Sequence, residues 1–268
     1  TEEFVEIGGA KIQLLKGGKG RPLLFLHGAA GAGIWLPFLQ KLARRFSVYA
    51  PAHPGFGRSE DPPWLDSVED MAHYYQEFLD WLGLKKVSVV GLSLGGWIAA
   101  ELATLCSHRI DRLVLVDAAG LKVDGVKVPD LFAMTPEEVV QHIFAKPETA
   151  AALFPADPTP EQMEVMLRQR ATLARLAWNP YFHNPKLPRR LGRIRVPTLV
   201  VWGEGDKLFP LEIGRAWERA IPGARLTVLE NCGHVPPLDD PNGFVRTVTE
   251  FLARRRGQAL TDGSAAIS

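Results

Sequence analysis

The chain has 268 residues, of which 46% are hydrophobic and 23% charged, so it can form one globular domain with a sizeable core. The formal net charge of +1 gives no reason to expect nucleic acid or an acidic membrane surface as a partner. No stretch approaches the ~18 consecutive apolar residues of a membrane span, and no signal peptide is visible. We therefore expect a cytoplasmic monomer or homodimer, although the chain begins at Thr1 and a leader could have been removed.

Short apolar runs predict strands, and they alternate with helical patterns. The first two runs flank Gly8-Gly9, a hairpin signal, and later runs rich in Val and Leu are typical of strands buried on both faces. Ser67 can cap a helix that Gly83 ends. The order predicts an α/β fold with a doubly wound, mostly parallel sheet. The predicted strands are residues 4–7, 11–15, 22–26, 47–50, 87–90, 113–116, 198–202 and 225–229.

One segment departs from this alternation. Residues 122–193 contain helical patterns and several prolines but no good strand. They predict a helical insertion between two strands of a core formed by residues 1–121 and 194–256. Residues 257–268 are polar and rich in small side chains, so we expect a flexible tail.

The sequence Gly91-Leu92-Ser93-Leu94-Gly95 matches G-x-S-x-G and lies between a predicted strand and a predicted helix. That context is typical of a nucleophile elbow, in which small flanking residues allow a sharp turn that exposes the serine hydroxyl. The pattern predicts Ser93 as a nucleophile. The Leu94 N–H at the helix N-terminus is then placed to stabilise negative charge.

A second loop, HGAAG at residues 27–31, follows the predicted strand at 22–26. Acyl transfer passes through an oxyanion that two backbone N–H groups usually stabilise. We assign these donors to Ala29 and Leu94, with Ala30 as a neighbouring alternative to Ala29. We interpret His27 as a structural residue of this loop rather than a base.

Two later loops supply an acid and a base. Asp206 follows the strand at 198–202 through two glycines, and His234 follows the next strand in the same way. The carboxyl ends of parallel strands are where open α/β sheets place active sites. His234 can take the Ser93 proton, and an ionised Asp206 can orient the imidazole. Asp117, after the strand at 113–116, is the rival to Asp206.

The two cysteines, Cys106 and Cys232, fit no CxxC or Cys/His ligand pattern, so we expect neither a disulfide framework nor a metal site. Cys232 lies two residues from His234. We interpret it as a buried filler rather than a thiol nucleophile. Serine chemistry of this kind requires no cofactor.

Five motifs together resemble the α/β-hydrolase superfamily over most of the chain, from Phe4 to about Ala253. They are HGAAGAG at residue 27, PGFGRSE at 54, GLSLGG at 91, WGEGDKLFP at 202 and GHVPPLDDP at 233. The resemblance is to the branch of esterases, enol-lactonases and carbon–carbon hydrolases. It implies that residues 122–193 form a helical cap over the active site.

Two departures from the family pattern bear on the substrate. Relatives usually carry an aspartate before the PGFG loop, whereas this chain has Ala52 and His53 there. The change is either a tolerated loop substitution or a sign that His53 faces the pocket. Many carbon–carbon hydrolases carry tryptophan directly after the catalytic histidine, and here that residue is Val235.

Ser93 also argues against epoxide hydrolases and haloalkane dehalogenases, which use an aspartate at this position.

The cap should roof an apolar pocket, because its segment contains large adaptable side chains. We expect Phe132, Met134, Trp178 and Phe182 to line it together with His53 and Val235, unless the cap residues instead form the cap's own core. The basic residues between Lys186 and Arg195 are expected to be solvated, with binding of a substrate carboxylate as the alternative.

The sequence therefore predicts a serine hydrolase for carboxylic esters that carry a small to medium hydrophobic group. The alternative within enzymes is a carbon–carbon or enol-lactone hydrolase that uses the same three residues. The alternative outside enzymes is a non-catalytic ligand-binding scaffold on this fold, since fold alone does not fix function.

Overall fold

The structure is a computed structural model that describes residues 1–155 and 157–254, so the tail predicted for residues 257–268 lies outside it. Its centre is an eight-stranded sheet in the order β1-β2-β4-β3-β5-β6-β7-β8. Each predicted strand is present. The strands are β1 (Glu2–Ile7), β2 (Ala10–Gly17), β3 (Arg21–Leu26), β4 (Phe46–Pro51), β5 (Val87–Leu92), β6 (Ile110–Val116), β7 (Thr198–Gly203) and β8 (Arg225–Leu229).

The sheet is mostly parallel, as predicted. Only the pairings of β1 with β2 and of β2 with β4 are antiparallel. The other six strands, which lie side by side in the order β4-β3-β5-β6-β7-β8, are all parallel to one another. The central strands β5 and β7 are buried along their whole length. Their uninterrupted apolar sequence is explained by helices on both faces of the sheet.

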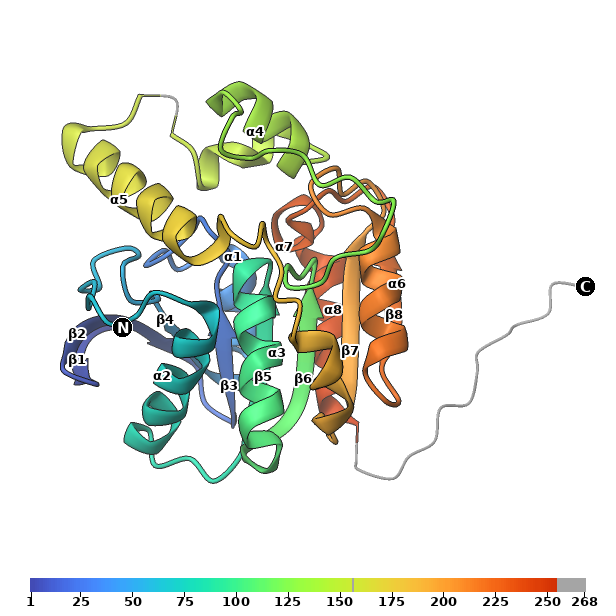
Figure 1. The fold of residues 1–268 in the computed structure, drawn as a ribbon. Coiled ribbons are helices and arrows are strands. Elements are labelled where there is room, and N and C mark those ends of the chain that lie inside the picture. Colours follow the sequence, from blue (N-terminus) through green and yellow to red (C-terminus); the bar gives the residue numbers. More distant parts are fainter. Residues whose placement is uncertain (156, 255–268) are drawn as a thin grey trace, which may run out of the picture.

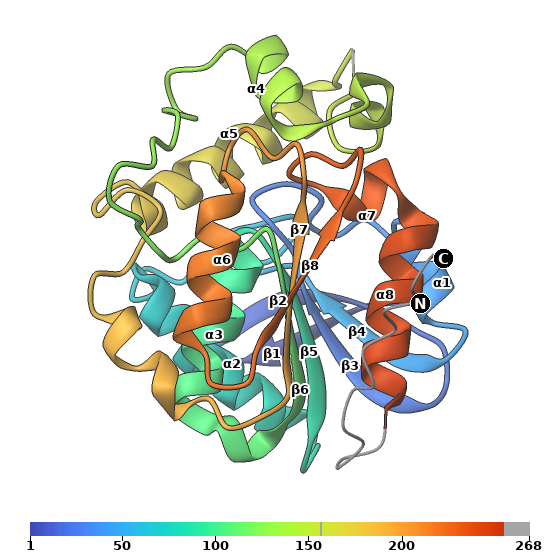
Figure 2. The same ribbon diagram turned by 90° about the vertical axis from the view of Figure 1, so that its right-hand side faces the viewer.

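Two helical layers cover the sheet (Figures 1 and 2). One layer contains α2, α3 and α6, and the other contains α1 and α8. Ser67 caps α2 as predicted, since its Oγ accepts a 3.1 Å hydrogen bond from the Asp70 N–H. The helices are α1 (Pro37–Leu42), α2 (Val68–Trp81), α3 (Leu94–Cys106), α6 (Leu211–Ala220), α7 (Pro236–Asp239) and α8 (Pro241–Ala253).

Residues 122–193 contribute α4 (Pro136–Ile143) and α5 (Pro160–Ala177), which lie above the end of the sheet (Figure 1). Each helix begins with a capping box, at Thr135 and at Thr159. The threonine hydroxyl accepts from the backbone N–H three residues later, and the side chain of that later residue accepts from the threonine N–H. Both helices are therefore fixed at their first turn.

Among the described residues, none of the helices combines the length and the hydropathy that a membrane span needs.

The approach of α3 to β3 depends on a glycine and gives a first prediction. A Cβ added at Gly95 would lie 2.2 Å from the Leu26 carbonyl oxygen and 2.5 Å from that of His27, and these backbone atoms cannot move aside. We expect Gly95→Ala to lower the free energy of unfolding by about 1–3 kcal/mol or more, measured by urea denaturation.

The matched control is Gly192→Ala, because a Cβ at that position has no neighbour within 4 Å. We expect that change to leave stability within roughly 0.5 kcal/mol of the unmodified chain. Equal stability of the two variants would mean that the close contact of α3 with β3 does not constrain the fold.

Candidate active site

Ser93 lies in the turn from β5 to α3, with a backbone φ of 54° that non-glycine residues rarely adopt. The conformation is held by main-chain hydrogen bonds: the Ser93 N–H donates to the Val116 carbonyl at 2.8 Å, and its carbonyl accepts from the Ala119 N–H at 3.2 Å. The turn also needs glycine, because a Cβ at Gly91 would lie 2.2 Å from the Gly95 oxygen. The predicted sharp turn is therefore present.

A continuous hydrogen-bonded chain links three predicted residues. The Ser93 Oγ lies 2.9 Å from the His234 Nε2, and the His234 Nδ1 lies 2.8 Å from the Asp206 Oδ2. All three side chains are buried, and they come from the loops after β5, β7 and β8. The arrangement can pass a proton from a serine hydroxyl to an imidazole that a carboxylate orients.

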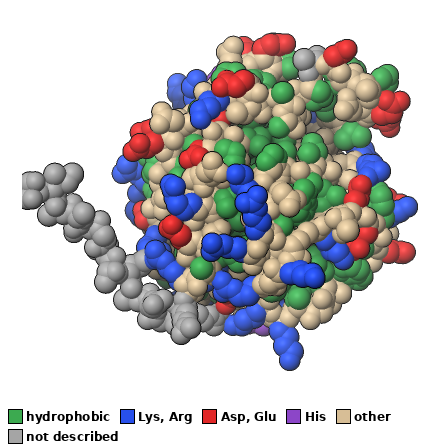
Figure 3. Space-filling view, turned by 180° about the vertical axis from the view of Figure 1, so that it is seen from behind, with side chains coloured by type: hydrophobic (Ala, Val, Ile, Leu, Met, Phe, Trp, Pro, Cys, Tyr) green, Lys and Arg blue, Asp and Glu red, His purple; other side chains and the backbone are tan. Residues whose placement is uncertain are grey.

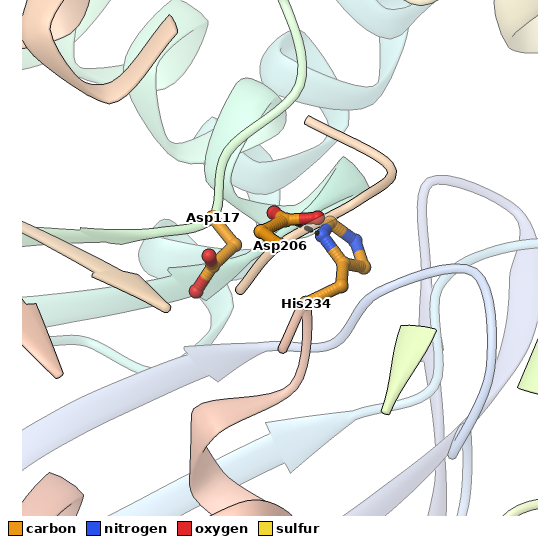
Figure 4. Close-up of side chains that lie close together, drawn as sticks. All are labelled: Asp117, Asp206 and His234. Atoms are coloured by element: carbon orange, nitrogen blue, oxygen red, sulfur yellow. Dashed lines mark hydrogen bonds and ion pairs between the residues drawn. The ribbon is translucent and has the colours of Figure 1, made fainter. Parts of the chain in front are cut away.

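Asp206 and its rival Asp117 lie in different environments. The Asp206 Oδ1 accepts from the N–H groups of Leu208 and Phe209, at 2.8 and 2.9 Å, and its other oxygen faces His234. Burial and the neighbouring Asp206 raise the pKa of Asp117 well above its usual value, and the Asp117 Oδ1 accepts from the Gly203 N–H at 2.9 Å instead of facing the imidazole. Figure 4 shows Asp206 between Asp117 and His234, with its carboxylate joined to the imidazole.

Other chemistry at this place is disfavoured by the same contacts. Asp117, Asp206 and His234 offer ligand atoms within 4.8 Å of one another, so they could in principle hold a metal ion. Both nitrogens of the His234 ring already have partners, however, since Nδ1 lies 2.8 Å from the Asp206 Oδ2 and Nε2 lies 2.9 Å from the Ser93 Oγ. Burial raises the pKa of the nearby Cys232 thiol to about 12, which keeps it protonated and unreactive.

The loop predicted to hold the oxyanion lies directly beside the serine. A Cβ on Gly28 would be only 3.3 Å from the Ser93 Cβ, and Ala29 lines the cavity above the serine. Leu94 is the first residue of α3. Within the residues that the structure describes, neither the Ala29 nor the Leu94 N–H donates to another protein group. Both donors are therefore available to a ligand.

Behind this loop, the imidazoles of His27 and His53 stack with their centroids 3.7 Å apart. The His53 N–H donates to the His27 Nε2, and the His53 Nε2–H donates to the His27 carbonyl, each at 2.9 Å. The His53 Nδ1 is left to accept from the Tyr75 hydroxyl. The expectation that His53 faces the pocket is thus not supported, because its ring is fully buried between two loops and α2.

A cavity of about 730 Å³ lies above Ser93 and His234, between the sheet and α4 and α5. Three predicted pocket residues line it: Phe132, Phe182 and Val235. Met134 and Trp178 do not. Trp178 is 54% exposed and packs edge-on against the outer side of Phe132, so it supports the wall from outside.

Met134 instead packs against the core cluster under α1 and α8, with no face on the cavity. The basic residues between Lys186 and Arg195 do not line the cavity either. Within that group, Arg190 forms an ion pair with Glu69 and lies 3.7 Å from Glu101. These contacts favour the expectation that the basic residues form a solvated surface, rather than a site that binds a substrate carboxylate.

Asp239 was not among the predicted site residues, yet its buried carboxylate joins the histidine loop to the cap. Its Oδ2 accepts from the Gly233 N–H at 2.8 Å and from the Ala145 N–H at 3.1 Å, and its Oδ1 accepts from the Lys146 N–H at 3.3 Å. The His234 N–H in turn donates to the Ile143 carbonyl at 2.7 Å. The backbone of the base is thus held by the end of α4.

These contacts predict the effect of Asp239→Asn. The substitution replaces one carboxylate oxygen by an amide nitrogen, which donates hydrogen bonds and cannot accept them. At least one of the backbone N–H groups then loses its acceptor, so the histidine loop should shift. A small displacement of a catalytic group can cost on the order of 10²-fold in rate. We expect a loss of about that size in the rate at which a fluorophosphonate labels Ser93.

Asp240→Asn is the matched control, because the Asp240 carboxylate accepts from the Gly243 N–H at the start of α8, and no hydrogen bond joins it to His234 or to the described residues of 122–193. We expect it to label at a rate within twofold of the unmodified chain. Equal labelling of the Asp239 and Asp240 variants would show that the Asp239 carboxylate does not position the base.

The stacked histidines predict a pH dependence of stability. Burial lowers the pKa of His27 from 6.5 to about 4, and burial and the neighbouring His27 keep the pKa of His53 well below 6.5. The unfolded chain therefore binds more protons than the folded chain between these values. Stability should be full above about pH 6.5 and fall as the pH drops toward 4, by roughly 3 kcal/mol for His27 alone.

Urea unfolding at pH 7.0, 5.5 and 4.5 measures this slope. His53→Asn should be less stable at pH 7 and show a flatter slope, while His108→Asn, at an exposed position, should keep the original slope. An unchanged slope in His53→Asn would contradict the assignment of the acid sensitivity to this pair.

Comparison with known proteins agrees with this geometry. Residues 23–247 match the family model described as "Alpha/beta hydrolase family". A 2-hydroxy-6-oxo-6-(2'-aminophenyl)hexa-2,4-dienoic acid hydrolase from Metapseudomonas resinovorans is 28% identical, with 95% of this chain and 92% of that protein covered. The crystal structure of a membrane phospholipase A superposes with a TM-score of 0.78 at 26% identity, covering 94% of this chain and 85% of that one.

The structure of a thermophilic esterase is likewise similar, with a TM-score of 0.70, 26% identity and coverage of 94% of this chain and 97% of that one. Esterases and a carbon–carbon bond hydrolase are thus similar to this chain to a comparable degree. The mostly parallel sheet, the strand–serine–helix turn and the matched family model together establish that this chain belongs to the α/β-hydrolase family of hydrolases.

Proposed function

We propose that the protein hydrolyses carboxylic esters through a covalent acyl-enzyme on Ser93. The observation that carries the proposal is the hydrogen-bonded chain from Ser93 through His234 to Asp206 at the floor of an apolar cavity. Each member has the partner that its role requires, and the hydroxyl faces the space where a substrate binds. No group outside the protein and water enters this mechanism.

In the first half-reaction, the Ser93 Oγ attacks the ester carbonyl carbon while His234 Nε2 takes the hydroxyl proton. The carbonyl oxygen becomes an oxyanion, which the N–H groups of Ala29 and Leu94 stabilise. The C–O bond to the alcohol then breaks, and the imidazolium gives its proton to the departing alkoxide. Asp206 keeps the imidazole in the tautomer that this transfer needs and stabilises its charged form.

In the second half-reaction, a water molecule takes the position of the alcohol. His234 removes its proton, the hydroxide attacks the acyl carbon, and a second oxyanion forms in the same place. Its collapse releases the acid and returns the proton to Ser93. The buried position of Ser93, about 7% exposed, limits competing water during the first step.

A second candidate is hydrolysis of a carbon–carbon bond in a vinylogous diketone. It is favoured by the similarity to the dienoic acid hydrolase and by Arg170, which lines the cavity, donates to the Phe132 carbonyl at 2.6 Å and has further N–H groups for a substrate carboxylate. Against it stands Val235, an aliphatic residue where many such enzymes carry tryptophan. Ester hydrolysis therefore remains the leading proposal.

The buried, unpaired thiols of Cys106 and Cys232 support the cytoplasm as the compartment we propose, since free thiols persist best under reducing conditions.

The test is a hydrolysis profile of the unmodified chain and of Ser93→Ala on nitrophenyl esters and, in parallel, on a ring-cleavage dienoate and an enol-lactone. We expect ester hydrolysis in the unmodified chain and a loss of about 10⁴–10⁶-fold in kcat in Ser93→Ala. Ser47→Ala is the control, because this half-buried hydroxyl donates to the Gly20 carbonyl at 3.1 Å and does not line the cavity.

The other outcomes separate the alternatives. Cleavage of the dienoate or lactone with no ester hydrolysis would replace the substrate class but keep the three residues. Activity that persists in Ser93→Ala would overturn the mechanism. A folded chain that turns over none of these substrates and resists fluorophosphonate labelling would support a non-catalytic binding scaffold.

A further inference from the structure

The cavity above Ser93 is larger and extends further than a small ester requires. Its volume of about 730 Å³ lies in the upper part of the ~300–1,000 Å³ that pockets for drug-sized ligands occupy. From the floor at Ser93 it continues past Leu153 and Phe154 to the N-terminal half of α5. One connected space thus joins the reacting hydroxyl to the outer helix of the cap.

The far end of this space is lined by apolar side chains that the protein leaves uncovered. Met163 is 49% exposed and Leu167 is 64% exposed, and their four-residue spacing places them on one face of α5. Across the opening, Ile34 is 43% exposed and lines the same cavity. Large apolar side chains exposed together in this way mark a binding surface more often than isolated ones do.

The two halves of α5 differ in a way that fits this interpretation. In the second half, Leu173 and Leu176 are buried against the core, as expected of an amphipathic helix. In the first half, no element of residues 1–155 or 157–254 covers Met163 or Leu167. Figure 3 shows hydrophobic side chains gathered in the upper part of the face opposite to that of Figure 1, whereas Lys and Arg are concentrated below.

We propose that this space binds a long, linear aliphatic chain of the substrate, with its ester group at Ser93 and its end against Met163 and Leu167. The inference rests on the proposed ester hydrolysis and names the substrate class: lipid-like esters rather than the small to medium esters that the sequence predicts. A flexible chain suits this wall, because methionine and leucine adapt to ligands without directional contacts. Binding then covers the surface that is uncovered in the free protein.

The proposal predicts a dependence on chain length. Each methylene that moves from water into the cavity should raise kcat/KM by about fourfold, until the chain passes the rim. Two ester series separate the two ends of the substrate: nitrophenyl alkanoates from acetate to palmitate carry the chain on the acyl side, and alkyl acetates carry it on the alcohol side. We expect kcat/KM to rise with chain length beyond octyl in one of the two series. That series shows whether the acyl chain or the alcohol chain of the substrate enters the cavity.

Leu167→Asp tests the rim itself. A charge at this position should lower kcat/KM for the twelve-carbon ester of the series that rises with length at least tenfold more than it lowers kcat/KM for nitrophenyl acetate. The matched control is Leu105→Asp, because Leu105 is also an exposed leucine of a helix but does not line the cavity. It should leave the whole chain-length profile unchanged, and thermal melting confirms that both variants fold.

Binding of dodecan-1-ol to Ser93→Ala, measured by calorimetry, tests the site without catalysis. We expect it to bind at least tenfold more tightly than hexan-1-ol, and Leu167→Asp should remove that difference. A profile that peaks at acetate or butyrate, an equal effect of Leu167→Asp on all lengths, or equal binding of the two alcohols would overturn the chain site. Tight dodecan-1-ol binding without hydrolysis of any ester would instead keep the site and refute the proposed reaction.

Discussion

The arrangement depends on one strained turn, the backbone of Ser93 between β5 and α3. A φ of 54° costs a serine on the order of 1–3 kcal/mol, and such strain persists only where the surroundings leave no alternative. Here the hydrogen bond from the Ser93 N–H to Val116 fixes one side of the turn. Close packing of Gly91 against Gly95 and of Gly95 against β3 fixes the other.

The same constraint organises the groups around the serine. Because α3 starts directly after the turn, the Leu94 N–H lies at the positive end of its dipole, next to the oxyanion loop. Because β5 is central and parallel to its neighbours, the loops after β7 and β8 end beside Ser93 and bring Asp206 and His234 into hydrogen-bond range. The buried stack of His27 and His53 holds the oxyanion loop from behind.

The cap is connected to the histidine as well as to the cavity. The end of α4 accepts the His234 N–H through Ile143, and Asp239 joins Gly233 to the following cap residues. The segment that roofs the cavity therefore also fixes the position of the base.

The strands could be predicted well from the sequence, because continuous apolar runs such as residues 87–90 have few alternatives to a buried strand. The helix α1 was not predicted, since six residues show too little of the 3.6-residue period. By contrast, α2 was predicted together with its ends, because Ser67 caps the helix and Gly83 ends it by local chemistry.

The site was predictable where a motif fixes local geometry and unpredictable where tertiary contacts decide. The loop sequences indicated Ser93 and His234, but the choice between Asp206 and Asp117 needed the distances to the imidazole. Contacts within the cap and between loops turned Trp178 and His53 away from the cavity. Asp239 was missed because its donors come from residues about 90 positions away in the sequence.

We propose that the Ser93 hydroxyl is the group that the substrate acylates. This can be measured by acid quenching of a reaction with nitrophenyl butyrate within milliseconds, followed by peptide mass spectrometry. We expect one butyryl adduct, on the peptide that contains Ser93, and no adduct in Ser93→Ala. An adduct on a different residue, or rapid hydrolysis in Ser93→Ala, would contradict it.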